Sequence, residues 1–171
     1  MNIEIRNIKE NEFDELGSIM VKTYANLEGF PSQTDQPEYY EMLRNIGAFT
    51  KKPNTKVLVA LSDKDDMLGG VVYFSDMNQY GSGGNAVNEN EASGIRLLAV
   101  KTNVRGGGVG KALTLACIDL AKNSGNKQII LHTTEAMKVA WGMYERLGFE
   151  RSPDLDFMQE KLSVFGFRHN I

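Results

Sequence analysis

A glycine-rich segment of this 171-residue chain has the residue types and spacing of a phosphate-binding loop. The sequence LAVKTNVRGGGVGK, residues 98–111, leads from an apolar run into an arginine, three glycines, a valine and a fourth glycine. Glycine lacks Cβ, so its backbone can approach a ligand closely and adopt positive φ. A helix that begins near Gly108 presents unpaired N–H groups and the positive end of its dipole to an anion. Arg105 adds a guanidinium that can bind phosphate through two hydrogen bonds.

Two common nucleotide-binding motifs do not fit this loop. The Walker loop requires a glycine where Arg105 stands and a Ser or Thr where Ala112 stands. The dinucleotide-binding fingerprint requires its third glycine at position 111 or 113, depending on the register, and neither residue is glycine. A third pattern consists of Arg or Gln, two residues, Gly, one residue, and Gly or Ala. Arg105, Gly108 and Gly110 match this third pattern.

Through this pattern the chain resembles the GNAT superfamily of N-acetyltransferases, whose loop of the same pattern binds the pyrophosphate of acetyl-coenzyme A. The flanking segments have the matching order and spacing. GIRLLAV, residues 94–100, resembles the central strand of the family. AWGMYERLGF, residues 140–149, resembles the family signature of Ala, three residues, Tyr, three residues and Gly-Phe. The resemblance is sharpest over residues 93–150, and it implies the fold of the family and its acetyl transfer to amines.

The resemblance also implies which residues hold acetyl-coenzyme A and which move protons. Backbone N–H groups around Leu98–Val100 would polarise the acyl carbonyl, as an oxyanion hole does. Tyr144 would protonate the departing thiolate, although its helical spacing also suits simple packing on an apolar face. The predicted coenzyme-binding residues are Leu98, Ala99, Val100, Arg105, Gly106, Gly107, Gly108, Val109, Gly110 and Lys111.

A base must accept a proton from the attacking amine, and the sequence marks it less clearly. Many members of the family carry a glutamate at the start of the central strand, where this chain has Gly94. Glu91 lies just upstream and is our predicted catalytic base, with Glu135 or an ordered water as alternatives. Met137 is a second departure, because the family often has an asparagine there that contacts the coenzyme arm.

The acceptor pocket is expected among the N-terminal helices, where the family usually builds it. Aromatic side chains cluster in these helices and their connection: Tyr24, Phe30, Tyr39 and Tyr40. Most such aromatic residues belong to a core, so the sequence indicates a region and not a set of contacts.

Hydrophobic periodicity predicts the elements that must hold these residues in position. The expected order is β-α-α-β-β-β-α-β-α-β-β. Together with the family resemblance, this order implies an α/β fold of mixed type, with a GNAT-like central sheet of six to seven strands and helices on both faces. A long polar segment, residues 76–93, is expected to be a loop. Strands are predicted over residues 2–8, 56–62, 68–75, 94–100, 127–133 and 164–170, and helices over 13–27, 37–46, 108–120 and 137–147.

Composition limits the classes of function and of partner. With 24% charged and 42% hydrophobic residues, we expect residues 1–171 to form a single GNAT-like domain. The net charge of −3 and the lack of long basic or apolar runs disfavour nucleic acid and membranes as partners. Two histidines and one cysteine make a metal site unexpected. The single Cys117 excludes an intrachain disulfide and fits the reducing cytoplasm, where we expect the protein to be.

The predicted function is N-acetyl transfer from acetyl-coenzyme A to a primary amine by direct transfer in a ternary complex. A small-molecule acceptor is favoured over a peptide or protein amine. The alternative from another class is a non-catalytic module that binds acyl-coenzyme A but lacks a working base. The sequence leaves open whether the protein forms a homodimer.

Overall fold

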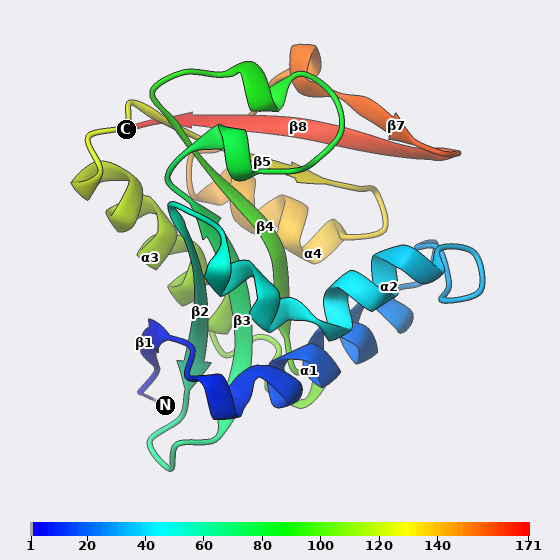
Figure 1. Cartoon of the computed structure of the whole chain (residues 1–171), viewed down its shortest axis with the longest axis vertical. Coiled ribbons are helices and arrows are strands. Elements are labelled where there is room, and N and C mark those ends of the chain that lie inside the picture. Colours follow the sequence, from blue (N-terminus) through cyan, green and yellow to red (C-terminus); the bar gives the residue numbers. More distant parts are fainter. Residues whose placement is uncertain (1) are drawn as a thin grey trace.

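The strands of the chain assemble into one mixed sheet with a short hairpin extension, as the computed structural model of residues 2–171 shows (Figure 1). The strand order is β1-β2-β3-β4-β5-β8-β6, and β7 pairs with β8. The strands are β1 (Glu4–Asn7), β2 (Thr55–Leu61), β3 (Met67–Phe74), β4 (Ala92–Val100), β5 (Gln128–Thr133), β6 (Glu150–Arg151), β7 (Phe157–Gln159) and β8 (Leu162–Asn170). The α-helices are α1 (Phe13–Ala25), α2 (Pro37–Arg44), α3 (Val109–Asn123) and α4 (Lys138–Arg146).

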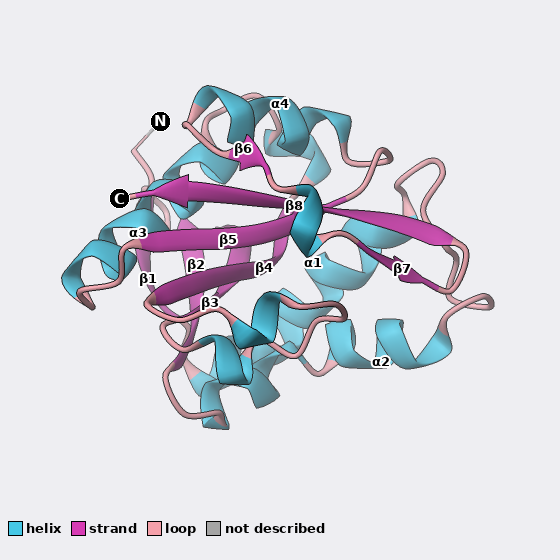
Figure 2. Ribbon diagram, turned by 90° about the horizontal axis from the view of Figure 1, so that it is seen from above, coloured by secondary structure: helices cyan, strands magenta, loops and turns pink. Residues whose placement is uncertain are grey.

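Helices cover both faces of the sheet, as predicted, and each face has its own core. Figure 2 shows α2 and α4 on opposite sides of the strands. Leu16, Met20 and Tyr24 of α1 pack into the first core, because their three- and four-residue spacing places them on one helix face. Leu113 and Cys117 of α3 pack into the second core, together with residues of α4. The predicted mixed α/β fold is confirmed, with eight strands in place of six to seven.

Strand β4 leaves its neighbour β5 partway along its length. The two strands run parallel, which requires a crossover connection, and α3 supplies it. Their pairing ends at Ile95, opposite Leu131. Immediately beyond, β4 bulges against β3, and Leu97 adopts a φ of 60°. The second half of β4 therefore has no strand partner on its β5 side.

Two segments differ from the sequence-based expectation. The polar segment 76–93 contains two short 3₁₀ turns, Met77–Gln79 and Ala86–Asn88, and its last two residues belong to β4. Buried Tyr80 anchors this segment to the sheet, which periodicity alone does not reveal. Between α4 and β8, where no strand range was predicted, the chain forms the short strands β6 and β7. Over residues 2–171, no helix combines the length and hydrophobicity that crossing a membrane would require.

Candidate active site

The loop between β4 and α3 has the geometry of an anion-binding loop. Gly106 and Gly108 have φ values of 83° and 85°, in the left-handed region that favours glycine. The first hydrogen bond of the helix runs from the Ala112 N–H to the Gly108 carbonyl at 2.9 Å. No side chain caps this end of α3. The N–H groups of residues 108–111 therefore lack partners within the helix and are available to a ligand.

This loop lines the larger of two neighbouring cavities, which has a volume of about 560 Å³ and is called here the large cavity. Four cationic residues line it: Arg105, Lys111, Lys138 and Arg146. No carboxylate lines it within residues 2–171. Positive charge and free N–H groups together suit a ligand that carries several phosphates.

Most of the predicted coenzyme-binding residues line the large cavity. They are Leu98, Val100, Arg105, Gly106, Gly108, Val109, Gly110 and Lys111. Ala99 and Gly107 do not line it. Ala99 is buried in the core on the α1 side, because alternate residues of a strand face opposite sides of the sheet. The N–H of Gly107 donates instead to the carbonyl of Val104 at 3.3 Å.

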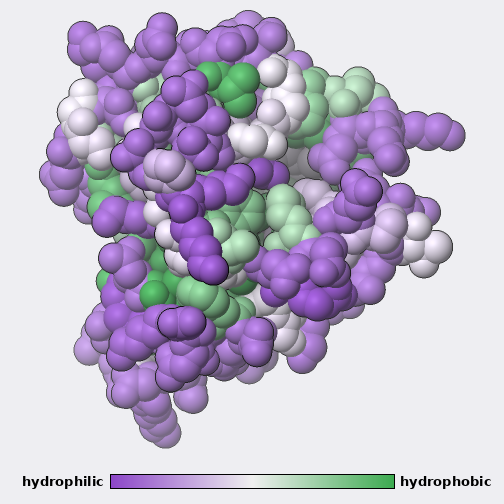
Figure 3. Space-filling model, viewed as in Figure 1, coloured by the Kyte–Doolittle hydropathy of each residue, from purple (hydrophilic) through white to green (hydrophobic). Residues whose placement is uncertain are grey.

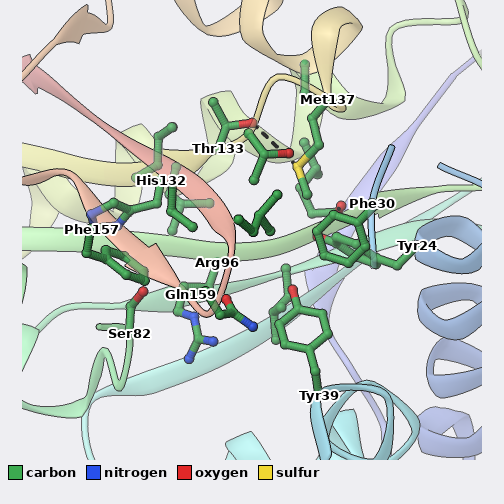
Figure 4. Close-up of a pocket in the computed structure, with 18 of the residues that line it drawn as sticks. Tyr24, Phe30, Tyr39, Ser82, Arg96, His132, Thr133, Met137, Phe157 and Gln159 are labelled. Carbon is green, nitrogen blue, oxygen red and sulfur yellow. Dashed lines mark hydrogen bonds between the residues drawn. The ribbon is translucent and has the colours of Figure 1, made fainter. Parts of the chain in front are cut away.

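The second cavity, called here the small cavity, has a volume of about 90 Å³ (Figure 4). Its walls come from α1, α2 and their connection, from the segment that contains Tyr80 and Ser82, and from β4 and β5. The segment 134–144 and the hairpin of β7 and β8 complete them. The two cavities share four lining residues: Tyr24, Leu98, Met137 and Ala140. Figure 3 shows that hydrophobic surface on one face of the molecule is gathered in patches with hydrophilic residues around them. The shared residues mark a junction where a ligand in one cavity can meet a ligand in the other.

The main chain of β4 borders this junction. The Tyr24 hydroxyl donates a hydrogen bond to the Leu98 carbonyl at 3.1 Å. Because pairing with β5 ends at Ile95, the N–H groups of β4 that face β5 beyond this residue lie outside the sheet ladder. Such donors can stabilise negative charge on a carbonyl oxygen held at the junction.

Tyr144 lies on α4 beside the junction, and its two ends differ in their surroundings. Its ring packs against Phe149, with 5.7 Å between ring centroids, and the side chain is 5% exposed. Its hydroxyl makes no hydrogen bond to another described residue, and the residue lines the small cavity. Burial raises the pKa of Tyr144 well above its usual value, with smaller contributions from Cys117 and Tyr80. The hydroxyl therefore stays protonated at neutral pH and can donate a hydrogen bond.

The structure does not bring Glu91 to this junction. Glu91 precedes β4 at a φ of 51°, is exposed, and forms an ion pair with Lys127 at 3.5 Å. Leu98 lies seven residues further along an extended strand, which at about 3.3 Å per residue is roughly 20 Å away. Glu135 lines neither cavity. Sequence proximity to Gly94 suggested Glu91 as the base, but its position gives that prediction no support.

Packing explains the glycine at position 94. A Cβ built on Gly94 would lie 2.4 Å from the ring of Tyr80, so the ring fills the space that a longer side chain would need. The Tyr80 hydroxyl lies 2.8 Å from Nδ1 of His132, whose Nε2 lies 2.9 Å from the Leu155 carbonyl. A carbonyl only accepts, so Nε2 carries the proton and Nδ1 accepts from Tyr80. Burial lowers the pKa of His132, which favours this neutral form. Both ring nitrogens of His132 therefore have hydrogen-bond partners within the protein.

Several residues of the small cavity could not be inferred as a set from the sequence. Tyr24, Phe30 and Tyr39 line it, as the expected aromatic region suggested, whereas Tyr40 is buried behind them and donates to the Pro31 carbonyl at 2.7 Å. Further polar residues reach the cavity from separate segments: Ser82, Arg96, Thr134 and Gln159. Arg96 is the one residue of this set that the sequence marks, because it is the only charged residue of the apolar segment GIRLLAV.

Comparison with known proteins identifies the family. The family model described as "Acetyltransferase (GNAT) family" matches residues 18–149, so the chain belongs to the GNAT acetyltransferase family. Acetyl-coenzyme A is the characteristic donor of this family.

Among curated proteins, the chain is 42% identical over 57 residues to N-alpha-acetyltransferase 30 of Schizosaccharomyces pombe, which covers 33% of this chain and 38% of that protein. It is 36% identical over 67 residues to mycothiol acetyltransferase of Streptosporangium roseum, covering 39% of this chain and 20% of that protein. The matches thus span less than two-fifths of the length of either relative.

Solved structures resemble the fold along the whole chain. The PaiA N-acetyltransferase from Thermoplasma acidophilum in complex with coenzyme A has a TM-score of 0.77 at 15% identity, with 100% of both chains covered. A GNAT-family acetyltransferase from Staphylococcus aureus Mu50 has a TM-score of 0.74 at 19% identity, with 99% of both chains covered. At these identities the likeness establishes the fold.

Proposed function

We propose that this protein transfers the acetyl group of acetyl-coenzyme A directly to the primary amine of a small molecule. The observation that carries the proposal is the junction of the two cavities at Leu98, Met137 and Ala140. A donor in the large cavity and an acceptor in the small one would meet there within a single ternary complex. Membership in the GNAT family supports acetyl-coenzyme A as the donor.

The charge and the free main-chain donors of the large cavity suit the phosphates of the coenzyme. The free N–H groups of residues 108–111 and the side chains of Arg105 and Lys111 would hold the pyrophosphate. Lys138 and Arg146, which line the same cavity, would neutralise the remaining phosphate. When bound, acetyl-coenzyme A supplies an acyl group activated as a thioester.

The residues at the junction supply the remaining functions. Main-chain N–H groups of β4 around Leu98 would stabilise charge on the acyl oxygen. The Tyr144 hydroxyl would protonate the departing thiolate, which leaves well because a thiol has a pKa of about 8.5. No carboxylate lines either cavity among the described residues, so the proton of the amine would pass to water.

Direct transfer is also supported by the state of the single cysteine. Cys117 has no exposed surface and lines neither cavity. Burial raises the pKa of its thiol, which opposes formation of the nucleophilic thiolate. An acetylated cysteine intermediate therefore has no support in this fold.

The size of the small cavity favours a small acceptor. At about 90 Å³, it has less than a fifth of the volume of the large cavity, which is about 560 Å³. That space suits a compact amine better than a folded protein segment.

The test is a screen of small primary amines and short peptides for coenzyme A release, followed by initial-rate kinetics. We expect release with at least one small amine, and intersecting double-reciprocal plots as both substrates are varied. Parallel plots would indicate an acetyl-enzyme and contradict direct transfer. Coenzyme binding without acceptor-dependent release would favour the non-catalytic alternative.

A further inference from the structure

The arginines of this protein divide into two groups according to their partners. Four form ion pairs with carboxylates: Arg6, Arg44, Arg151 and Arg168. The others are Arg96, Arg105 and Arg146, which form no ion pair within residues 2–171, and each lines one of the two cavities. Arg105 and Arg146 face the large cavity, where phosphates of the coenzyme would neutralise them. Arg96 faces the small cavity and has no such counterion.

The surroundings of Arg96 leave much of its hydrogen-bonding capacity free. The side chain is half-buried, and its Nη1 donates to the Tyr80 carbonyl at 3.0 Å. Its Nη2 has only a weak contact with the Met42 sulfur at 3.9 Å. A guanidinium carries five N–H donors, so most remain available to a ligand. A partly buried charge without a counterion is costly, and an anionic ligand would remove that cost.

The charge of Arg96 acts on the walls of the small cavity. Burial raises the pKa of Tyr39 to about 12, and the nearby positive charge of Arg96 opposes that rise. The same charge opposes the larger rises that burial causes in the pKa values of Tyr24 and Tyr80. All three tyrosines line the cavity, so the positive charge reaches the space that the acceptor would fill.

Three polar side chains lie together in the small cavity. Figure 4 shows the Arg96, Ser82 and Gln159 side chains gathered on one side, away from Met137. Met137 belongs to the junction with the large cavity, where the amine must react. Phe30 and Phe157 provide apolar surface for a side chain. Arg96 is the only charged residue that lines the small cavity within the described chain.

We infer that the acceptor is a small amino acid or a related amino-carboxylate, and that Arg96 selects it by binding its carboxylate. This inference rests on the proposed acetyl transfer and names the class of its acceptor. Arg96 would hold the carboxylate through two hydrogen bonds, while the amine of the same molecule points to the junction. A peptide amine lacks a free carboxylate on the adjoining carbon and would leave Arg96 without a partner.

The experiment compares each common amino acid with its amide, for example L-leucine with L-leucinamide, at saturating acetyl-coenzyme A. The two amines differ in intrinsic reactivity, so the decisive quantity is the acid-to-amide ratio of kcat/KM in wild type relative to the Arg96→Gln variant. We expect the substitution to lower this ratio by about tenfold or more, because it removes the charge that would bind the acid and not the amide. The exposed Arg44→Gln variant is the matched control and should keep the wild-type ratio.

A second arm uses wild-type protein alone, in case Arg96→Gln does not fold. A carboxylate without an amine, such as 4-methylpentanoate, should inhibit competitively against the best acceptor, and 4-methylpentanamide should not. Equal ratios in wild type and Arg96→Gln, equal inhibition by acid and amide, or no turnover with any amino acid would overturn the inference. Turnover only with amines that lack a carboxylate would overturn the inference and leave the proposed acetyl transfer intact. Failure of acetyl-coenzyme A to bind would contradict both the proposed acetyl transfer and this inference.

Discussion

The large and small cavities meet at one junction but are built in different ways. The large cavity is formed mainly by two continuous segments, residues 98–111 and 136–147, and its binding groups are main-chain N–H groups and cations. The small cavity is formed by side chains from at least five separate segments. The large cavity should therefore be sensitive to added bulk or negative charge, and the small one to the chemistry of individual side chains.

The largest expected effect is beside the junction, where the two proposed substrates would meet. Tyr144→Phe keeps the buried ring and removes the hydroxyl. We expect kcat to fall by about ten- to a hundredfold, with coenzyme affinity nearly constant, because the hydroxyl would act mainly in the transition state. Steady-state kinetics, with chemistry shown to be rate-limiting, measures this change. An unchanged kcat would assign Tyr144 to packing alone.

The pH profile sharpens the same prediction. Burial raises the pKa of the Tyr144 hydroxyl above its usual value, so the proton is present throughout the neutral range. The wild-type rate should fall only as the pH approaches this raised value, above about 10. The decline at high pH should be absent in Tyr144→Phe.

A second prediction tests the large cavity through added bulk and charge. A Cβ on Gly110 would lie 3.5 Å from the Met143 sulfur and 3.8 Å from Leu98, which are ordinary contact distances, so the fold should survive. Gly110→Asp should weaken acetyl-coenzyme A binding about tenfold or more, or about 1.4 kcal/mol. Calorimetric titration measures the affinity, and Gly110→Ala, without the charge, should lose less. Unchanged affinity in folded Gly110→Asp would refute the assignment of the loop.

A third prediction tests one polar group of the small cavity. The Thr134 hydroxyl is buried without a hydrogen-bond partner, although the residue is 4% exposed and lines the cavity. Thr134→Val should raise stability by about 1 kcal/mol, since it removes an unsatisfied polar atom. It should also lower kcat/KM about three- to tenfold if this hydroxyl binds a substrate. Thr134→Ser keeps the hydroxyl and is the control; unchanged kcat/KM in Thr134→Val would exclude a role in binding.

The same contrast explains what the sequence could predict. Arg105, Gly108 and Gly110 follow one another along the chain, so their spacing carries the geometry of the loop. The small cavity has no such local signature, because Ser82 and Gln159 are brought together only by the fold. The order of most elements along the chain followed from periodicity, and the helices on both faces of the sheet followed from the family resemblance. Tyr80, which fills the space beside Gly94, lay in a segment without periodicity.

The smallest expected effect concerns Glu91. Its proximity in sequence to Gly94 favoured Glu91 as the base. However, the extended strand β4 carries the chain far from Glu91 before it reaches Leu98, and Glu91 forms an exposed ion pair with Lys127. Glu91→Gln should therefore change kcat/KM less than about twofold and stability by less than about 1 kcal/mol. Rates across the pH range provide the check. A loss of tenfold or more would restore Glu91 as the base and require β4 to move.

The most direct test of acetyl transfer at the junction follows the acetyl group itself. Wild-type protein is mixed with acetyl-coenzyme A labelled in the acetyl group and with the best acceptor from the amine screen, and products are quantified by mass spectrometry. Labelled N-acetyl product and free coenzyme A should form in equal amounts, and only when the acceptor is present. Acetyl-coenzyme A that binds but remains intact with every acceptor, or a label that first appears on the protein, would contradict direct transfer.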